Sequence, residues 1–306
     1  MAFPDSAGPK SVINPRTPID VLAVVGVGLI GGSFAAALKR RSGVKRVLGV
    51  GRERAHLLQA QRLGLIDEIV TLAEAVARAN LLFLAIPVGA MRSVFQQIRP
   101  HLHDNLLITD AGSTKQDVVT AAQEVLQERI GQFIPGHPIA GSEASGPEAA
   151  DSLLYLGRTV VLTVLPQNNT SDRDFLRSVW ELCGARVVVM SASRHDAAMA
   201  AVSHMPHFLA SVFMGAMASS AEAESRMALA GSGFSDFTRI AAGSPEVWRD
   251  IFLANRSALL EELANFRQAL EDAEHSLKVE DEQALYKFLE KAALARRFWG
   301  SRSGLT

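Results

Sequence analysis

Residues 19–33 read IDVLAVVGVGLIGGS, the most informative segment of the chain about its fold. An apolar run with β-branched residues ends in glycines spaced G-x-G-x-x-G, and good helix formers follow. This order predicts a buried strand, a tight turn and a helix. Gly26 allows the turn, Gly28 lets a pyrophosphate approach the backbone, and Gly31 lets helix and strand pack closely. N–H groups at the helix start, around Leu29 and Ile30, then face the phosphates of a dinucleotide.

The composition excludes several classes of protein. With 306 residues the chain is long enough for two domains. Its formal net charge is -1 and no run of Lys or Arg exceeds three residues, so we expect no nucleic-acid partner. The single cysteine, Cys183, allows no intramolecular disulfide and fits a reducing compartment. Residues 1–18 lack the apolar core of a signal peptide, and the longest apolar candidate, residues 197–218, is interrupted by two histidines and a proline. We therefore expect a cytoplasmic protein without a membrane span.

Apolar runs alternate with helical segments as far as residue 190. The runs that read as strands after the first lie at 44–50, 66–71, 81–86, 106–110 and 133–137, and two more, at 159–165 and 186–190, flank a helix at 172–182 and extend the same domain. Strands alternating with helices of this length predict a parallel sheet covered on both faces. We expect an α/β chain with a flexible arm at 1–18, a Rossmann-type dinucleotide-binding domain at 19–190, and an all-α domain at 191–306.

Only long helices are predicted after residue 190, at 191–219, 245–277 and 280–298. The second of them carries one apolar stripe at helical spacing, made of Val247, Ile251, Ala258, Leu259, Leu263, Phe266 and Leu270. Such helices outside a single core often pair between subunits. We therefore expect a homodimer built on the C-terminal helices.

The end of the second strand predicts which dinucleotide binds. An acidic residue about 20 positions past the glycines ordinarily holds the ribose hydroxyls of NAD. Here Gly51 occupies that place and Arg52 follows it, so a 2′-phosphate would meet a guanidinium and no carboxylate. This favours NADP as the cofactor. NAD stays possible because Glu53 is close enough to act as the missing acid, and Arg52 and Arg54 could simply lie on a solvated helix start.

Three predicted strands end in polar residues or a proline, at the edge of the sheet where such folds bind ligands. These ends hold Pro87, the segment 110–115 with Ser113, and the segment 136–143 with His137. A histidine there can accept a proton from a substrate hydroxyl while hydride leaves the same carbon. We predict His137 as the catalytic base and Ser113 as a second hydrogen-bonding group on that hydroxyl. The alternative is that His137 only caps a turn before Pro138.

Five segments together resemble one family of enzymes. They read GVGLIGGS at 26–33, DAGSTK at 110–115, GHPIAGSE at 136–143, SHMPH at 203–207 and GFSDFTRIA at 233–241. In this order they look like the successive signatures of prephenate dehydrogenases, a family that includes cyclohexadienyl and arogenate dehydrogenases of tyrosine biosynthesis. The resemblance implies oxidative decarboxylation of prephenate or arogenate, with hydride transfer to NADP or NAD, giving 4-hydroxyphenylpyruvate or tyrosine.

The resemblance also implies roles for individual side chains. His137 matches the histidine that hydrogen-bonds the ring hydroxyl, and Ser113 matches the serine beside it. Arg239 matches the arginine that binds a substrate carboxylate, and His207 a histidine of the second domain that lines the same pocket. The resemblance also implies four further substrate-site positions. Each either shapes or gates the site in relatives or is next to a residue that does so. They are Ser142, Glu143, Asp236 and Trp248.

Some of these residues also have plainer interpretations. His204 and His207 are three apart and share a helix face, yet either could be a buried core histidine. Pro206 between them predicts a kink. Trp248 could only pack at a helix N-terminus, and Arg239 could form a surface ion pair. No cluster of side chains has metal-ligand spacing, so we predict no metal.

Two other functions fit a Rossmann domain followed by helices. A β-hydroxyacid or imine-type dehydrogenase would be expected to use a lysine in the helical half, and residues 191–219 contain none. A nonenzymatic dinucleotide sensor would give no reason for His137, Ser113 and Arg239 together. The sequence supports both of these alternatives less well than the dehydrogenase activity that the motifs suggest.

Overall fold

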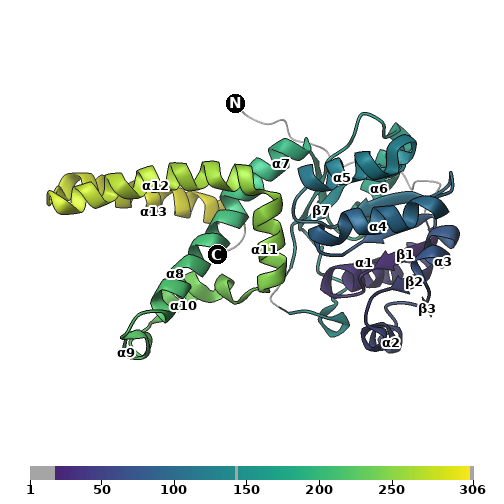
Figure 1. The fold of residues 1–306 in the computed structure, drawn as a ribbon, viewed down its shortest axis with the longest axis horizontal. Coiled ribbons are helices and arrows are strands. Elements are labelled where there is room, and N and C mark those ends of the chain that lie inside the picture. The colour runs from purple at the N-terminus through teal and green to yellow at the C-terminus, as the bar shows by residue number, and fades with distance from the viewer. Residues whose placement is uncertain (1–17, 142–143, 304–306) are drawn as a thin grey trace. The chain divides into compact units, whose positions relative to one another are not determined.

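The computed structural model describes residues 18–141 and 144–303. The chain forms two compact units, one that extends to Asn255 and one that begins at Arg256. The larger unit contains a six-stranded parallel sheet in the order β3-β2-β1-β4-β5-β6 (Figure 1). Its strands are β1 (Ile19–Val25), β2 (Val44–Val50), β3 (Glu68–Ile69), β4 (Leu81–Leu84), β5 (Leu107–Asp110) and β6 (Phe133–Ile134).

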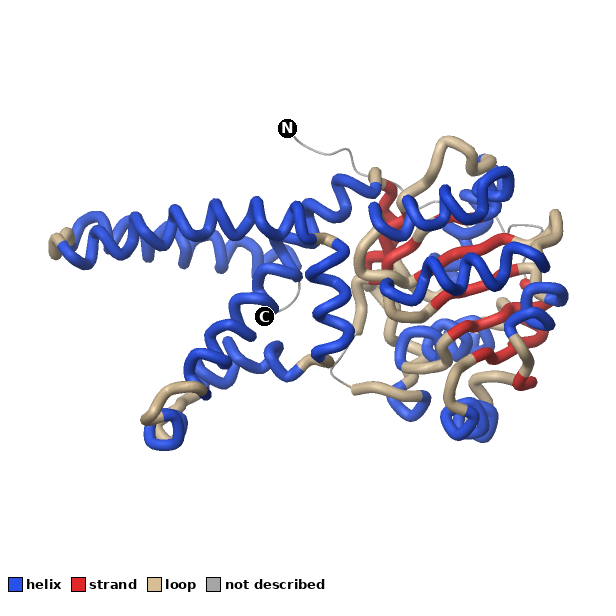
Figure 2. The backbone as a smooth tube through the Cα atoms, in the orientation of Figure 1, coloured by secondary structure: helices blue, strands red, loops and turns tan. Residues whose placement is uncertain are grey.

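Helices cover both faces of this sheet, as the tube in Figure 2 shows. They are α1 (Leu29–Arg40), α2 (Arg54–Arg62), α3 (Leu72–Arg78), α4 (Met91–Ile98), α5 (Gln116–Leu126) and α6 (Thr170–Leu182). Alternate residues of β1 point to opposite faces. Val24 packs in one core cluster with Phe34 of α1 and Trp180 of α6, whereas Val25 packs in another with Phe95 of α4. Burial on both faces explains why the strands read as unbroken apolar runs.

The chain leaves the parallel sheet earlier than the sequence predicted. We expected one strand over 133–137, but β6 ends at Ile134 and a new strand, β7 (Gly136–Pro138), begins after Pro135. β7 belongs to a second sheet, in which it runs antiparallel to β8 (Thr159–Leu162), and β8 runs parallel to β9 (Arg186–Val189). Pro135 has no N–H to continue the first ladder. His137 therefore lies inside a short strand of its own and not at the end of β6.

From Ala192 to Ser303 the described residues form helices and no strand, as predicted. Those before Arg256 are α7 (Ala192–Met199), a π turn (Ala200–His204), α8 (Met205–Ala218), α9 (Ala223–Met227), α10 (Ser232–Thr238) and α11 (Pro245–Ala254). In the π turn the Met205 N–H bonds to the carbonyl of Ala200, five residues back. Pro206 follows directly and cannot donate the next helical hydrogen bond. The irregularity predicted at Pro206 is thus a widened turn that precedes it.

The single helix predicted over 245–277 is wrong, because it is broken at Asn255. This buried asparagine donates from Nδ2 to the carbonyl of Asp196 over 2.7 Å, and the same atom lies 3.0 Å from Nδ1 of His204. Its backbone leaves the helical region, with φ -103° and ψ 29°. These contacts hold α11 against α7 and the π turn and end the helix there.

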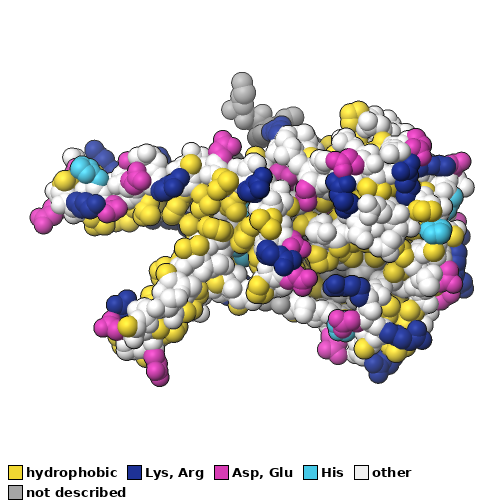
Figure 3. Space-filling model, viewed as in Figure 1, with side chains coloured by type: hydrophobic (Ala, Val, Ile, Leu, Met, Phe, Trp, Pro, Cys, Tyr) yellow, Lys and Arg dark blue, Asp and Glu magenta, His cyan; other side chains and the backbone are white. Residues whose placement is uncertain are grey.

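The unit that begins at Arg256 is a pair of helices, α12 (Arg256–Lys278) and α13 (Glu282–Ser303), which contact each other. Large apolar side chains stay exposed along this pair, including Leu260, Leu270, Leu277, Leu289 and Phe298. Exposed apolar side chains also gather on α8, among them Val212 and Phe213 (Figure 3). Contiguous apolar surfaces of this kind mark interaction sites in soluble proteins.

Candidate active site

Two adjoining cavities lie at the carboxyl edge of the parallel sheet. The smaller, about 340 Å³, is lined by the glycine turn at 28–31, by residues 85–88 that follow β4, and by residues 111–113 that follow β5. The larger, about 600 Å³, is lined by the segment 137–141 and by parts of the helical region, from the π turn to α11. Both volumes are in the range of small-molecule sites. Leu29, Ile30 and Ser113 line both cavities, so what binds in one is next to what binds in the other.

The glycine turn has the geometry that a bound pyrophosphate needs. Gly26 has φ +92°, and a Cβ there would lie 2.2 Å from the carbonyl oxygen of Ala85. A Cβ on Gly31 would lie 2.1 Å from the Gly26 oxygen. A Cβ on Gly28, in contrast, would meet nothing within 4 Å, because this residue faces the smaller cavity. The backbone at the start of α1 is therefore open to a ligand, as the sequence predicted.

A buried ion pair joins β5 to β7. The side chains of Asp110 and Lys115 are fully buried and bond to each other. The Asp110 carboxylate also accepts the N–H groups of Gly112 and Gly136, at 2.8 and 2.9 Å. The Lys115 ammonium in turn donates to the carbonyl of Gly136 over 2.7 Å. Both backbone groups of Gly136 are thus fixed, and with them the position of the next residue, His137.

His137 lines the larger cavity and is partly buried. Burial lowers its pKa well below the ordinary value, and the nearby His195, Lys115 and His204 lower it further. The imidazole is therefore neutral at physiological pH and can accept a proton. Ser113 lines the same cavity from the loop after β5, so the predicted base and its hydroxyl neighbour do converge.

Two residues behind His137 were missed by sequence reasoning. Nε2 of His195 lies 2.8 Å from Nδ1 of His137, and Nδ1 of His195 lies 2.7 Å from the Asp196 carboxylate. Both residues are buried in α7. Neighbouring residues of a helix do not normally face each other, so the pattern gave no reason to pair them. The only available signal was a His-Asp pair in the first turns of a helix that starts at the carboxyl edge of the second sheet.

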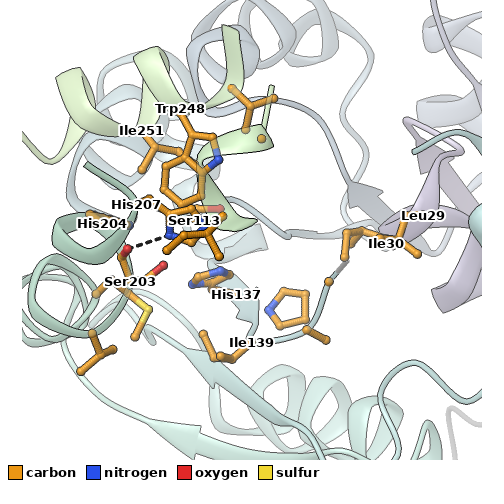
Figure 4. A pocket seen from close by; sticks show the side chains of 18 of the residues that line it. Leu29, Ile30, Ser113, His137, Ile139, Ser203, His204, His207, Trp248 and Ile251 are labelled. Carbon is orange, nitrogen blue, oxygen red and sulfur yellow. Dashed lines mark hydrogen bonds between the residues drawn. The ribbon is translucent and has the colours of Figure 1, made fainter. Parts of the chain in front are cut away.

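The helical wall of the cavity is aromatic. The ring of Trp248 stacks on His207 with centroids 3.7 Å apart, and Figure 4 shows the two rings one over the other. His207 bonds through Nδ1 to the carbonyl of Ser203 over 2.8 Å, the contact dashed in Figure 4. His204 also lines the cavity but is buried, bonds to Asn255, and has its pKa lowered to about 4 by burial. Burial likewise lowers the pKa of His207, so both imidazoles are neutral at physiological pH.

The remaining predicted substrate residues have different positions. Arg239 lines the larger cavity, and its charge contributes to lowering the pKa of His207. Asp236 is exposed on α10 and is not among the residues that line the cavity. Ser142 and Glu143 lie outside the described residues, as do residues 1–17 of the predicted arm.

The predicted cofactor residues divide in a similar way. Pro87, Ser113 and residues 28–31 line the smaller cavity. Arg52 does not, but it follows β2 beside the glycine turn, where the Gly26 N–H bonds to the carbonyl of Val50 over 2.9 Å. Arg52 is exposed.

The Rossmann-type sheet has an open glycine turn, and the adjoining cavity holds a neutral histidine and an arginine. Together these features define a nicotinamide-dinucleotide-dependent dehydrogenase. Comparison with known proteins narrows this class. Residues 34–189 match the model of the prephenate dehydrogenase nucleotide-binding domain, and residues 191–291 match that of the prephenate dehydrogenase dimerization domain. The chain belongs to the prephenate dehydrogenase family, and it is an enzyme of the prephenate/arogenate dehydrogenase type.

Individual relatives agree with this assignment. The chain is 34% identical to a prephenate dehydrogenase of Lactococcus lactis over 90% of its own length and 76% of the relative's. It is 33% identical to a cyclohexadienyl dehydrogenase of Zymomonas mobilis, over 90% and 94% of the two chains. These proteins form a family of soluble enzymes.

Solved structures are similar over nearly the whole chain. Prephenate dehydrogenase from A. aeolicus, in complex with hydroxyphenyl propionate and NAD+, has a TM-score of 0.85 at 32% identity and covers 91% of this chain and 97% of its own. Synechocystis arogenate dehydrogenase has a TM-score of 0.78 at 30% identity and covers 91% of this chain and 99% of its own. The recognition made from the five motifs is confirmed.

Proposed function

We propose that the larger cavity binds prephenate or arogenate, with His137 as the base for the ring hydroxyl and Arg239 as the cation for a carboxylate. The observation that carries this proposal is that one cavity collects a neutral imidazole, a serine hydroxyl and a guanidinium beside the glycine turn. An Arg can hold a carboxylate by two parallel hydrogen bonds, which fixes the substrate in one orientation.

The chemistry requires one group at each end of the ring. The substrate has a hydroxyl opposite a quaternary carbon that bears a carboxylate. A dinucleotide held on the glycine turn would supply the hydride acceptor for the hydroxyl-bearing carbon. His137 takes the hydroxyl proton, so that carbon becomes a carbonyl. The bond to the ring carboxylate then breaks, carbon dioxide leaves, and the electron pair aromatises the ring. His137 returns the proton to the phenol oxygen, so no net proton is released.

The other cavity residues support these two groups. We assign to Ser113 a hydrogen bond to the same hydroxyl. The stacked side chains of His207 and Trp248 form the side of the cavity against which the substrate ring packs. His204 has a structural bond to Asn255, so we give it a supporting place in that wall. The roles of Ser142, Glu143 and Asp236 rest on the family motifs alone.

For the cofactor we favour NADP over NAD. The pyrophosphate would lie on the glycine turn, at Gly26, Gly28 and Gly31 with Leu29 and Ile30, and Pro87 and Ser113 would line the nicotinamide side. Arg52 has no ion-pair partner among the described residues and can meet a 2′-phosphate. Glu53, the acid that could serve NAD instead, lies 3.5 Å from His56 within the first turn of α2.

For the assembly we favour a cytoplasmic homodimer with a domain boundary near 190/191. The last strand of the first domain ends at Val189, and the segment 191–291 matches a dimerization domain. Residues Ala192–Ala218 are apolar and long enough to span a membrane by length and composition alone, with little of their surface buried. We infer that a second subunit, not lipid, covers this surface, because the same segment contributes His204 and His207 to the cavity.

The test is NADPH formation, followed by absorbance, with purified protein on prephenate and on arogenate, and with NAD as the cofactor control. Turnover of either substrate supports the proposal, and the ratio of the two specificity constants gives the preferred one. A protein that binds NADP tightly but oxidises neither substrate would contradict it. A strong preference for NAD would overturn the cofactor assignment alone.

A further inference from the structure

A chain of three side chains runs from the cavity into the interior. His137 contacts His195 over 2.8 Å, and His195 contacts Asp196 over 2.7 Å. The two imidazole rings lie nearly edge to face, with centroids 5.0 Å apart. His195 and Asp196 are buried, so water does not compete for these bonds.

The positions of the protons in this chain follow from Asp196. A carboxylate only accepts, so Nδ1 of His195 carries the proton of that bond. In the tautomer of His195 that this bond selects, Nε2 is an acceptor, and the 2.8 Å contact with His137 then requires a proton on Nδ1 of His137. Neutral His137 consequently has its lone pair on Nε2, which has no hydrogen-bond partner among the described residues. That is the nitrogen left for a substrate.

Asp196 is itself held rigidly. Its Oδ1 accepts the N–H of Lys115 and its Oδ2 that of Gln116, both over 2.8 Å, at the first residues of α5. The Asn255 amide also bonds to the backbone carbonyl of Asp196. Since every polar atom of its side chain is bonded, Asp196 fixes the ring orientation of His195 as well as its tautomer.

We propose that His195, oriented by Asp196, is the positioning residue that holds His137 in its Nδ1–H tautomer, with Nε2 free to accept the substrate proton. His195 also accepts a hydrogen bond from His137 while that ring is an imidazolium, between proton uptake from the hydroxyl and proton return to the phenol. The tautomer of His137 can be measured without substrate, whereas the effect of His195 on the reaction rate rests on the function proposed above.

Two substitutions of His195 separate this role from a structural one. His195→Gln places an amide oxygen near the position of Nε2, so it can still accept from His137 but loses the bond to Asp196. His195→Asn places its amide near Nδ1, so it keeps the Asp196 contact and is too short to reach His137. We expect His195→Gln to keep kcat within about 5-fold of the native value and His195→Asn to lower it by about 10- to 100-fold, with KM changed less than about 3-fold in both.

The second readout is the tautomer itself. In the free protein labelled with ¹⁵N-histidine, long-range ¹H–¹⁵N spectra distinguish Nδ1–H from Nε2–H rings, and His137→Asn identifies the resonance. We expect the Nδ1–H form of His137 in the native protein and in His195→Gln, and a mixture or the Nε2–H form in His195→Asn.

Either readout can overturn the proposal. If His195→Asn is as active as the native enzyme, or if it is more active than His195→Gln, His195 serves Asp196 and the start of α5 instead of His137. An unchanged tautomer in His195→Asn has the same meaning. Failure of the native enzyme to oxidise prephenate or arogenate would contradict the proposed function but leave the tautomer measurement as a test of this inference.

Discussion

Replacing Lys115 by methionine is expected to lower the free energy of unfolding by about 4 kcal/mol, in the range for removing one partner of a buried ion pair. The Lys115 and Asp110 side chains are fully buried. After the substitution the Asp110 charge stays in the interior with only the N–H groups of Gly112 and Gly136 as partners. The Gly136 carbonyl also loses its bond to the ammonium, and the cost of this unsatisfied buried acceptor, about 1 kcal/mol, is included in that figure.

The assay is urea unfolding followed by tryptophan fluorescence, at one fixed protein concentration because association shifts apparent stability. Asp110→Asn alone should cost about as much, since it strands the lysine charge, but the double variant should cost well under the sum, with a coupling above about 2 kcal/mol. The control is Lys45→Met, which removes an exposed pair with Asp20 and should change stability by no more than about 0.5 kcal/mol. Additive costs for the two single variants, or a loss below about 1 kcal/mol for Lys115→Met, would refute the reasoning.

Four further predictions concern function. His137→Asn should lower kcat at least about 100-fold with little change in dinucleotide affinity, measured by fluorescence titration, and native-like turnover would remove His137 from the mechanism. Since burial lowers the pKa of His137, and the base works only when neutral, kcat/KM should hold its value from pH 7.5 down to pH 6 and fall only below that; a half-loss near the ordinary histidine pKa would contradict this. Arg239→Gln should raise KM for the substrate more than it lowers kcat, and an unchanged KM would discard its assigned role. Arg52→Gln should weaken NADP binding about 10-fold, because one charge-assisted hydrogen bond is lost, and should leave NAD binding nearly unchanged. Arg54→Gln is the matched control. An equal effect of Arg52→Gln on the binding of both cofactors would contradict the prediction.

Much of the fold could be predicted because local patterns determine it. The apolar run before Gly26 is buried on both faces of the sheet, and the three glycines each meet a steric need of the turn. The change from strands to helices after residue 190 was also visible in the periodicity. What failed was set by tertiary contacts. Asn255 ends α11 by bonding to Asp196 and His204, groups about 50 to 60 positions earlier in the chain, and no rule about adjacent residues contains that information.

The site was predictable in part for the same reason. His137, Ser113 and Arg239 were identified from motifs, and the fold brings them to one cavity although His137 and Arg239 are far apart in sequence. The groups behind His137 could not be found in this way. Lys115 read as one letter of a motif, and His195 as a polar residue on a helix, because burial and partners are properties of the folded chain.

The π turn at Ala200–His204 sets the angular relation between two histidines. His195 and His207 are 12 residues apart, and in an uninterrupted α-helix such residues differ in direction by roughly 120°. A π turn takes up about one extra residue without advancing the helix, which leaves a difference of roughly 20°. One continuous helix can therefore direct His195 toward the back of His137 and His207 into the cavity. Deleting Ala201 is expected to restore a regular α-helix and so to raise the helical circular dichroism signal. The same deletion should lower kcat, because the regular helix would rotate either His195 away from His137 or His207 away from the cavity.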